Sequence, residues 1–86
     1  MFEVILSPEA QDFYAEADRP LARKLTRCFE QLEKEPRRHS AIKMLTGDFK
    51  GFRRFRVGQW RVVYEIDDSA RTVRVLSVAH RREVYE

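Results

Sequence analysis

Basic side chains gather between Asp48 and Glu65, and most of them are arginines. This stretch contains no acidic residue and five basic ones, namely Lys50, Arg53, Arg54, Arg56 and Arg61. A guanidinium is planar, stays protonated and donates hydrogen bonds in pairs, so it binds phosphate oxygens and stacks on bases. We therefore interpret the stretch as a site for a phosphodiester backbone. A strand edge that is kept soluble by its charges is the alternative interpretation.

Positive charge is concentrated in the second half of the chain. Residues 1–35 hold five basic and eight acidic side chains, whereas residues 36–86 hold twelve basic and six acidic ones. Such a separation favours an anionic partner on one face of the protein. Charge alone does not distinguish nucleic acid from an acidic protein segment.

The length and composition predict one domain, residues 1–86, because 86 residues do not form two cores. The apolar runs are short and the amino terminus has no basic leader. We therefore expect no membrane span, no signal peptide and a cytoplasmic location. The single Cys28 has no partner for a disulfide and no metal-ligand spacing to other residues, so we expect neither a metal nor a cofactor.

The elements that must position these side chains begin with a short strand and two helices. Alternation over residues 2–6 predicts the strand. Ser7 and Pro8 start a helix, Pro20 starts a second one, and Pro36 ends it. Residues 36–50 are expected to be a loop, anchored to the core by Ile42, Met44 and Leu45.

Three strands follow, at residues 52–57, 60–66 and 72–79, and their short connections predict antiparallel pairing. Alternation places Trp60 and Tyr64 against the helices and Arg61 on the opposite, open face, and it puts Arg54 and Arg56 on one side of their strand. The residues expected to share a side of the last strand are Val73, Val75, Ser77, Ala79 and, if the strand continues, Arg81. The order β-α-α-β-β-β predicts an α+β fold with a two-helix hairpin on one face of an antiparallel sheet.

Three blocks of this sequence resemble the RelE/ParE superfamily of bacterial toxins, and the RelE branch in particular. They are residues 43–47 (KMLTG), 54–65 (RFRVGQWRVVYE) and 78–85 (VAHRREVY). The resemblance extends to the first strand and the helices, so it covers nearly the whole chain. It implies the toxin of a type II toxin-antitoxin system, with a RelE-like fold.

Members of the RelE branch cleave messenger RNA in the ribosomal A site, and a cognate antitoxin encoded by the adjacent gene inhibits them. The resemblance implies that Arg61 and Arg81 contact the scissile phosphate and that Tyr85 orients the cut nucleotide. The further candidates for binding the RNA are Lys50, Arg53, Arg54, Arg56 and Arg82. The resemblance implies a helical antitoxin, and from charge complementarity we expect its contact surface to be acidic.

In metal-free RNA cleavage the 2′-hydroxyl attacks the adjacent phosphate, so one proton must be removed and the growing charge on the phosphate must be balanced. Arg61 and Arg81 suit the second task. Arg54 and Arg56 stand where well-studied members carry lysines, and arginines are poor general bases. His80, whose ordinary pKa is close to neutral, is therefore our candidate for the acid or base.

Two other functions and several simpler roles stay open at this point. A ParE-like toxin would bind DNA gyrase without cutting RNA, and a remnant of a toxin would bind RNA or an acidic partner without activity. His80 could equally be a hydrogen-bonded residue at a strand end, and Tyr85 could close the edge of the core.

Overall fold

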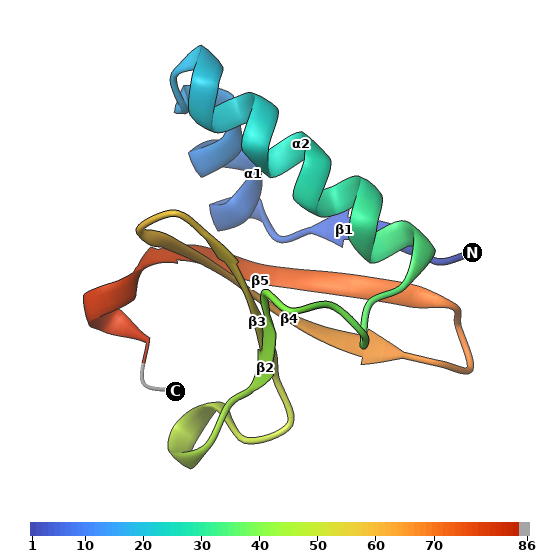
Figure 1. The fold of residues 1–86 in the computed structure, drawn as a ribbon. Helices are drawn as coiled ribbons and strands as arrows, with labels where there is room; N and C mark the ends of the chain where they lie inside the picture. Colours follow the sequence, from blue (N-terminus) through green and yellow to red (C-terminus); the bar gives the residue numbers. More distant parts are fainter. Residues whose placement is uncertain (85–86) are drawn as a thin grey trace.

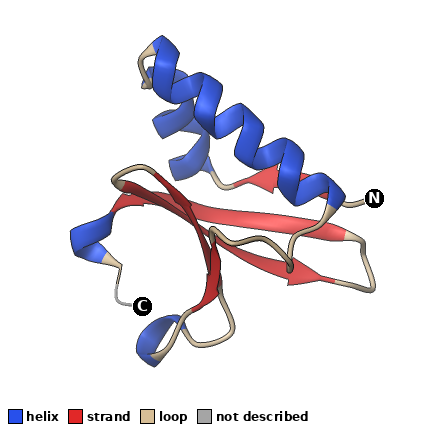
Figure 2. Cartoon of the chain, viewed as in Figure 1, coloured by secondary structure: helices blue, strands red, loops and turns tan. Residues whose placement is uncertain are grey.

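The computed structural model describes residues 1–84. Its strands are β1 (Glu3–Leu6), β2 (Ile42–Met44), β3 (Arg53–Val57), β4 (Trp60–Asp67) and β5 (Thr72–His80). Its helices are α1 (Pro8–Glu16) and α2 (Arg19–Lys34), and two short 3-10 turns are η1 (Gly47–Phe49) and η2 (Arg81–Glu83). Figures 1 and 2 show both helices on one side of a curved sheet. The predicted α+β fold is confirmed.

α1 begins at Pro8, as the sequence predicts, and α2 begins at Arg19, one residue before the predicted Pro20. The hydroxyl of Ser7 accepts a hydrogen bond from the amide of Ala10 at 3.1 Å, and the carboxylate of Asp18 accepts one from the amide of Leu21 at 2.9 Å. These contacts satisfy amides that have no partner within the first helical turn. A proline near each start lacks the amide that would have needed such a partner.

The sheet has the strand order β1-β5-β4-β3-β2 and is mixed, which corrects the expectation of a wholly antiparallel sheet. β1 pairs in parallel with β5, whereas the other three pairings are antiparallel. The two-helix hairpin between β1 and β2 allows this arrangement, because a parallel neighbour needs a long crossover. The outer edge of β1 is capped at its ends, since the amide of Phe2 donates to the carbonyl of Glu33 and the side chain of Gln11 donates to the carbonyl of Leu6.

The predicted loop at residues 36–50 contains a strand and a turn, so this expectation was wrong in part. β2 pairs with β3, with Lys43 opposite Arg54. Of the three expected anchors, Ile42 packs against the core and Leu45 is buried, but Met44 is 65% exposed. β2 extends the sheet only as far as Phe55, because Ile42 is its first residue.

β5 changes its phase in the middle of the strand. Val63 lies opposite Ser77 and Tyr64 lies opposite Val75, so Leu76 is an extra residue in β5. As a result Val73 and Val75 pack in the core with the helices, whereas Ala79 packs in a separate cluster on the other face. The expectation that Val73, Val75, Ser77 and Ala79 share one side was wrong for this reason.

Apolar side chains are buried on both faces of the sheet. The larger cluster lies between the sheet and the helices and includes Leu25, Leu32, Val62, Tyr64 and Val73. A smaller cluster of Leu45, Val63 and Val84 lies on the face that the helices leave uncovered. We call this second face the open face. The segment after β5 therefore folds back over part of the open face.

Candidate functional site

Arg61 occupies a fixed position at one end of the open face. It lies opposite Arg56 on β3 and opposite Ala79 on β5, on the side away from the helices, as predicted. One nitrogen of its guanidinium donates to the carbonyl oxygens of Gly58 at 2.9 Å and Trp60 at 3.0 Å. The side chain is only 9% exposed, which the sequence did not predict. The guanidinium is thus held against the turn that joins β3 to β4.

This turn depends on Gly58, whose φ of +60° lies in the left-handed region. A side chain at this position would meet no neighbour, so any substitution would strain only the backbone. The turn also anchors the residue after β5, because the amide of Arg81 donates to the carbonyl of Gln59 at 2.8 Å. Arg61 and the first residue of η2 are therefore tied to the same two-residue turn.

Arg54 and Arg56 share the open face with Arg61 but differ in environment. Arg56 is exposed. Arg54 is 5% exposed, and its guanidinium donates to the carbonyl of Ala41, which precedes β2. Arg56 is thus able to contact a ligand, whereas Arg54 joins β3 to the segment before β2. This division between the two residues was not visible in the sequence.

The remaining basic candidates are not all at the same place. Arg53 lies opposite Tyr64 and therefore points to the helix side of β3, away from Arg54 and Arg56. Lys50 follows η1 and is exposed, at the far end of the β3 strand from the turn. Arg82 is exposed in η2. Of the basic candidates that the structure describes, Arg56, Arg61, Arg81 and Arg82 lie at the end of the sheet that carries the β3–β4 turn, which we call the arginine end.

His80 is not brought together with Arg61. It lies opposite Trp60, and the two rings meet edge to face with their centroids 5.5 Å apart, on the helix side of the sheet. Its Nδ1 accepts a hydrogen bond from the amide of Arg82 at 3.3 Å, and its Nε2 lies 3.3 Å from Oε1 of Gln59. A neutral ring with its proton on Nε2 satisfies both contacts. The position indicates a residue that orders η2.

Tyr85 lies outside the described residues, but the segment that leads to it is anchored. Val84 is 5% exposed and packs with Leu45 and Val63 on the open face. The alternation of the strands did not reveal this cluster. Leu45 comes before the three predicted strands in the sequence and Val84 comes after them, so neither residue belongs to an alternating pattern. The one available signal was the apolar character of Val84 within a charged tail.

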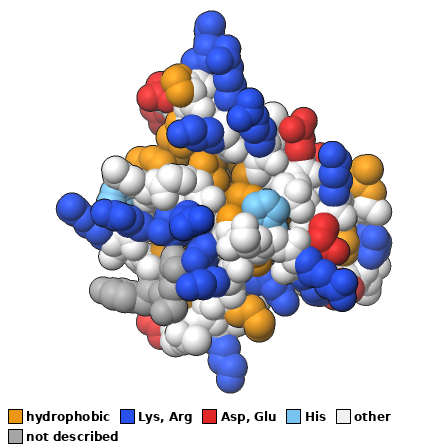
Figure 3. Space-filling model, in the orientation of Figure 1, with side chains coloured by type: hydrophobic (Ala, Val, Ile, Leu, Met, Phe, Trp, Pro, Cys, Tyr) orange, Lys and Arg blue, Asp and Glu red, His pale blue; other side chains and the backbone are white. Residues whose placement is uncertain are grey.

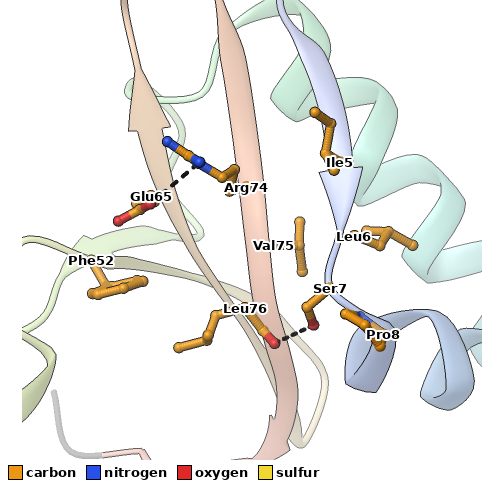
Figure 4. A pocket seen from close by; sticks show the side chains of 9 residues that line it. All are labelled: Ile5, Leu6, Ser7, Pro8, Phe52, Glu65, Arg74, Val75 and Leu76. Atoms are coloured by element: carbon orange, nitrogen blue, oxygen red, sulfur yellow. Dashed lines mark hydrogen bonds and ion pairs between the residues drawn. The ribbon is translucent and has the colours of Figure 1, made fainter.

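A shallow apolar hollow of about 350 Å³ lies toward the β1 edge of the sheet, and Ile5, Phe52 and Leu76 contribute to its lining. Figure 4 shows these side chains together with the ion pair between Arg74 and Glu65. Arg74 also pairs with Asp67, at 3.3 Å. Because its one arginine is neutralised by acids, this hollow does not offer a phosphate site, unlike the arginine end of the open face.

Other kinds of site are not formed by the part of the chain that the structure describes. Within residues 1–84 no group of three or more His, Cys, Asp or Glu side chains is arranged to hold a metal ion. None of the helices described is long and apolar enough to cross a membrane. Cys28 is buried, and burial raises the pKa of its thiol to about 12, so it is not a nucleophile at neutral pH.

Comparison with known proteins identifies the family. Residues 4–85 match the family described as the ParE toxin of the type II toxin-antitoxin system parDE. The chain belongs to this toxin family. No curated protein matches this ParE-family toxin significantly by sequence. The family match over residues 4–85 confirms the resemblance to the RelE/ParE superfamily.

Solved structures similar to this ParE-family toxin include two toxin-antitoxin complexes. One is RelBE2 from Mycobacterium tuberculosis, at 31% identity over 93% of this chain and 98% of the other, with a TM-score of 0.76. The archaeal RelE-RelB complex from Pyrococcus horikoshii OT3 has 20% identity over 93% and 94% of the two chains and a TM-score of 0.80. The YoeB/ParE toxin from Agrobacterium tumefaciens has 18% identity over 92% and 98%, with a TM-score of 0.81. The last two show the fold alone.

Proposed function

We propose that this toxin is a ribosome-dependent endonuclease that cleaves messenger RNA in the A site of the ribosome, through attack of the 2′-hydroxyl and without a metal ion. The observation that carries the proposal is the fixed guanidinium of Arg61 beside the start of η2. Stabilisation of a transition state by charge is strongest where the donor is held in place before the reaction begins. The proposal places the toxin in the cytoplasm, where ribosomes translate.

The arginines divide the work in this proposal. Arg61 and Arg81 balance the charge that builds up on the phosphate, and Arg56 and Arg82 bind the neighbouring backbone. Arg54 holds the segment before β2 from its buried position. In this proposal Tyr85 orients the cut nucleotide. The position of His80 on the helix side supports a positioning role, through Gln59 and η2, in place of direct proton transfer. In this proposal water accepts the proton of the 2′-hydroxyl and supplies one to the leaving 5′-oxygen.

The test is cleavage of a message on programmed ribosomes by wild type, Arg61→Ala and Arg81→Ala. Loss of a principal charge-stabilising donor lowers the rate by about 10²- to 10³-fold, or about 2.7 to 4 kcal/mol. Arg74→Ala is the matched control, because Arg74 is an exposed cation whose ion pairs with Glu65 and Asp67 lie away from the arginine end. A rate for Arg61→Ala equal to that of Arg74→Ala would refute the proposal.

Because Arg61 is buried and hydrogen-bonded, its replacement also tests the fold. Thermal unfolding of each variant shows whether a lost rate comes from a lost structure. Arg61→Lys is the second variant, since it keeps the charge but not the two-carbonyl contact in the same geometry. We expect Arg61→Lys to fold and to cleave more slowly than wild type.

A second candidate function is supported by the ParE name of the matched family. A ParE-like toxin would bind DNA gyrase and leave RNA intact. Induced expression separates the two, because codon-phased cuts in translated messages support the nuclease, whereas intact messages with a DNA-damage response support the gyrase toxin. Neither response would indicate a remnant that binds without activity.

We further propose that a cognate antitoxin, encoded by the adjacent gene, neutralises the toxin. Two of the similar structures are toxin-antitoxin complexes. The arginine end of this toxin favours a helical partner whose contact surface is acidic, since complementary charges speed association and exclude wrong partners. A neutralising partner whose contact surface is basic would contradict this part of the proposal.

A further inference from the structure

A second basic groove lies between α2 and the edge of β3, and we call it the α2–β3 groove. Its volume is about 460 Å³, and it is formed in part by Lys24, Arg27, His39, Phe55, Arg56 and Val57. No described residue that lines it is acidic. The groove lies where β2 begins: its ladder with β3 reaches Phe55, and the amide of Arg56 still donates to the carbonyl of Ala41, but no described strand continues beside Val57.

The cations of α2 form one wall of this groove. Lys24 and Arg27 are three residues apart in the helix, so their side chains lie on the same side of it, and both are exposed. Figure 3 shows Lys and Arg side chains along the helical layer and again beside the sheet, with apolar surface between the two groups. A polyanion lying in the groove would meet positive charge on both walls.

The floor of the groove is aromatic and apolar. The ring of His39 lies against that of Phe55, with centroids 4.9 Å apart and planes inclined by 34°. Nδ1 of His39 accepts a hydrogen bond from the amide of Ala41 at 3.0 Å, so the ring is held in place. His39 is also an exposed residue. A groove that combines basic walls with a fixed exposed ring suits single-stranded nucleic acid, whose bases stack while its backbone is neutralised.

Arg56 connects the α2–β3 groove to the proposed cleavage site. Its backbone position lies opposite Arg61 on the open face, yet it also lines the groove. A strand of RNA at Arg61 could therefore pass the β3 edge at Arg56 and reach Lys24 and Arg27 without leaving positive surface. The groove is thus continuous with the arginine end of the open face.

We propose that the α2–β3 groove binds the single-stranded RNA that continues beyond the cleaved linkage. This inference rests on the proposed function, since it extends the same RNA past the same site. RNA is favoured over an acidic protein strand because the carbonyl of Ala41 already accepts the hydrogen bond of the Arg56 amide. The Arg56 amide is therefore not free to pair with an added peptide strand. Base stacking and phosphate contacts do not need a free backbone amide.

The test measures binding of a single-stranded RNA of about 12 nucleotides, within the range that such grooves hold. All its 2′-hydroxyls are methylated, so it cannot be cleaved through them. Affinity is measured against salt concentration for wild type and for the double variant Lys24→Gln/Arg27→Gln. The matched control is Arg19→Gln/Arg23→Gln, which removes two exposed charges from α2 outside the groove.

Each phosphate contact on a single strand contributes about 0.7 to the slope of log affinity against log salt, so the groove variant should lose about 1.4. Between 50 and 200 mM salt its affinity should then fall about sevenfold less than that of wild type. The control should keep the wild-type slope. Equal slopes for the two double variants, with unchanged unfolding temperatures, would overturn the proposal.

The outcomes also separate this inference from the proposed function. If Arg61→Ala cleaves as fast as its control but the groove variant has a smaller slope of log affinity against log salt, the nuclease proposal is refuted and RNA binding by the groove is supported. If Arg61 is needed for cleavage and the two double variants bind alike, only the groove fails. A groove variant that keeps its RNA slope but no longer binds an acidic antitoxin would overturn the RNA assignment in favour of a protein surface.

Discussion

Replacement of Val84 by alanine should loosen the segment that carries Arg81 while leaving the rest of the fold intact. Val84 is buried against Leu45 and Val63 on the open face. The substitution removes two methyl groups, and at about 0.8 kcal/mol for each buried carbon the loss is about 1.6 kcal/mol. Because Val84 follows η2 and lies outside the paired strands, this loss should appear as local opening.

Hydrogen exchange of single amides measures this opening directly. A loss of about 1.6 kcal/mol raises the opening constant about 15-fold, since about 1.4 kcal/mol corresponds to a factor of ten. The amide of Arg81, which donates to the carbonyl of Gln59, should exchange faster by that factor. Amides of the central strand β4, such as that of Val62, should not change. Ribosome-dependent cleavage should slow, because Arg81 is held in place less of the time.

A uniform rise in exchange, with β4 affected as much as η2, would refute this reasoning. It would mean that Val84 belongs to the cooperative core and that the carboxyl-terminal segment does not open by itself. Ile5→Ala is a suitable control, because Ile5 is also apolar but is 45% exposed at the β1 edge of the sheet. We expect this variant to leave the exchange of the Arg81 amide unchanged.

Three further predictions concern stability and the site. Tyr64→Phe removes the buried hydroxyl that donates to the carbonyl of Pro36 at 2.7 Å. The free energy of unfolding, measured by chemical denaturation, should therefore fall by about 1 to 3 kcal/mol. An unchanged denaturation midpoint would contradict a stabilising role for this hydrogen bond. The hydrogen bond from Arg37 lowers the pKa of Asp68 in the folded protein. The Asp68 carboxylate therefore takes up a proton more readily in the unfolded chain, so the free energy of unfolding should fall as the pH drops below about 4. Asp68→Asn should make that fall shallower, and an identical acid profile would rule out the contribution. His80→Gln should retain cleavage to within about tenfold, whereas loss of a general acid or base costs about 10²- to 10⁴-fold, so a larger loss would return His80 to the chemistry.

The elements that local sequence determines were predicted well. Ser7 caps α1 through a contact within three residues, and a proline lies in the first turn of α2, so both signals are readable from a short window. Pairings between distant segments were not predictable in this way. The parallel pairing of β1 with β5 and the short strand β2 depend on neighbours far along the chain, and β2 has too few residues to show an alternation.

The sequence predicted the face of the sheet on which Arg61 lies, but not the burial of its side chain. Alternation along β4 placed Arg61 on the face away from the helices, because its neighbours Trp60 and Val62 are apolar. The burial of Arg61 and Arg54 was not predicted, since reasoning from charge places guanidinium groups in solvent, and their carbonyl partners come from turns and loops. The helix-side position of His80 follows from the extra residue in β5, which no sequence pattern marked.

The extra residue Leu76 decides which surface receives everything that follows it in the chain. With Leu76 present, Ala79 stands beside Arg61 and His80 beside Trp60. If Leu76 paired regularly with β4 and did not bulge, every later residue of β5 would move by one position, so that Ala79 would face the helices and His80 the side that carries the arginines. Whether a methyl group or an imidazole lies beside Arg61 is thus set by the bulge at one position of β5, and not by the identity of the side chains that follow it.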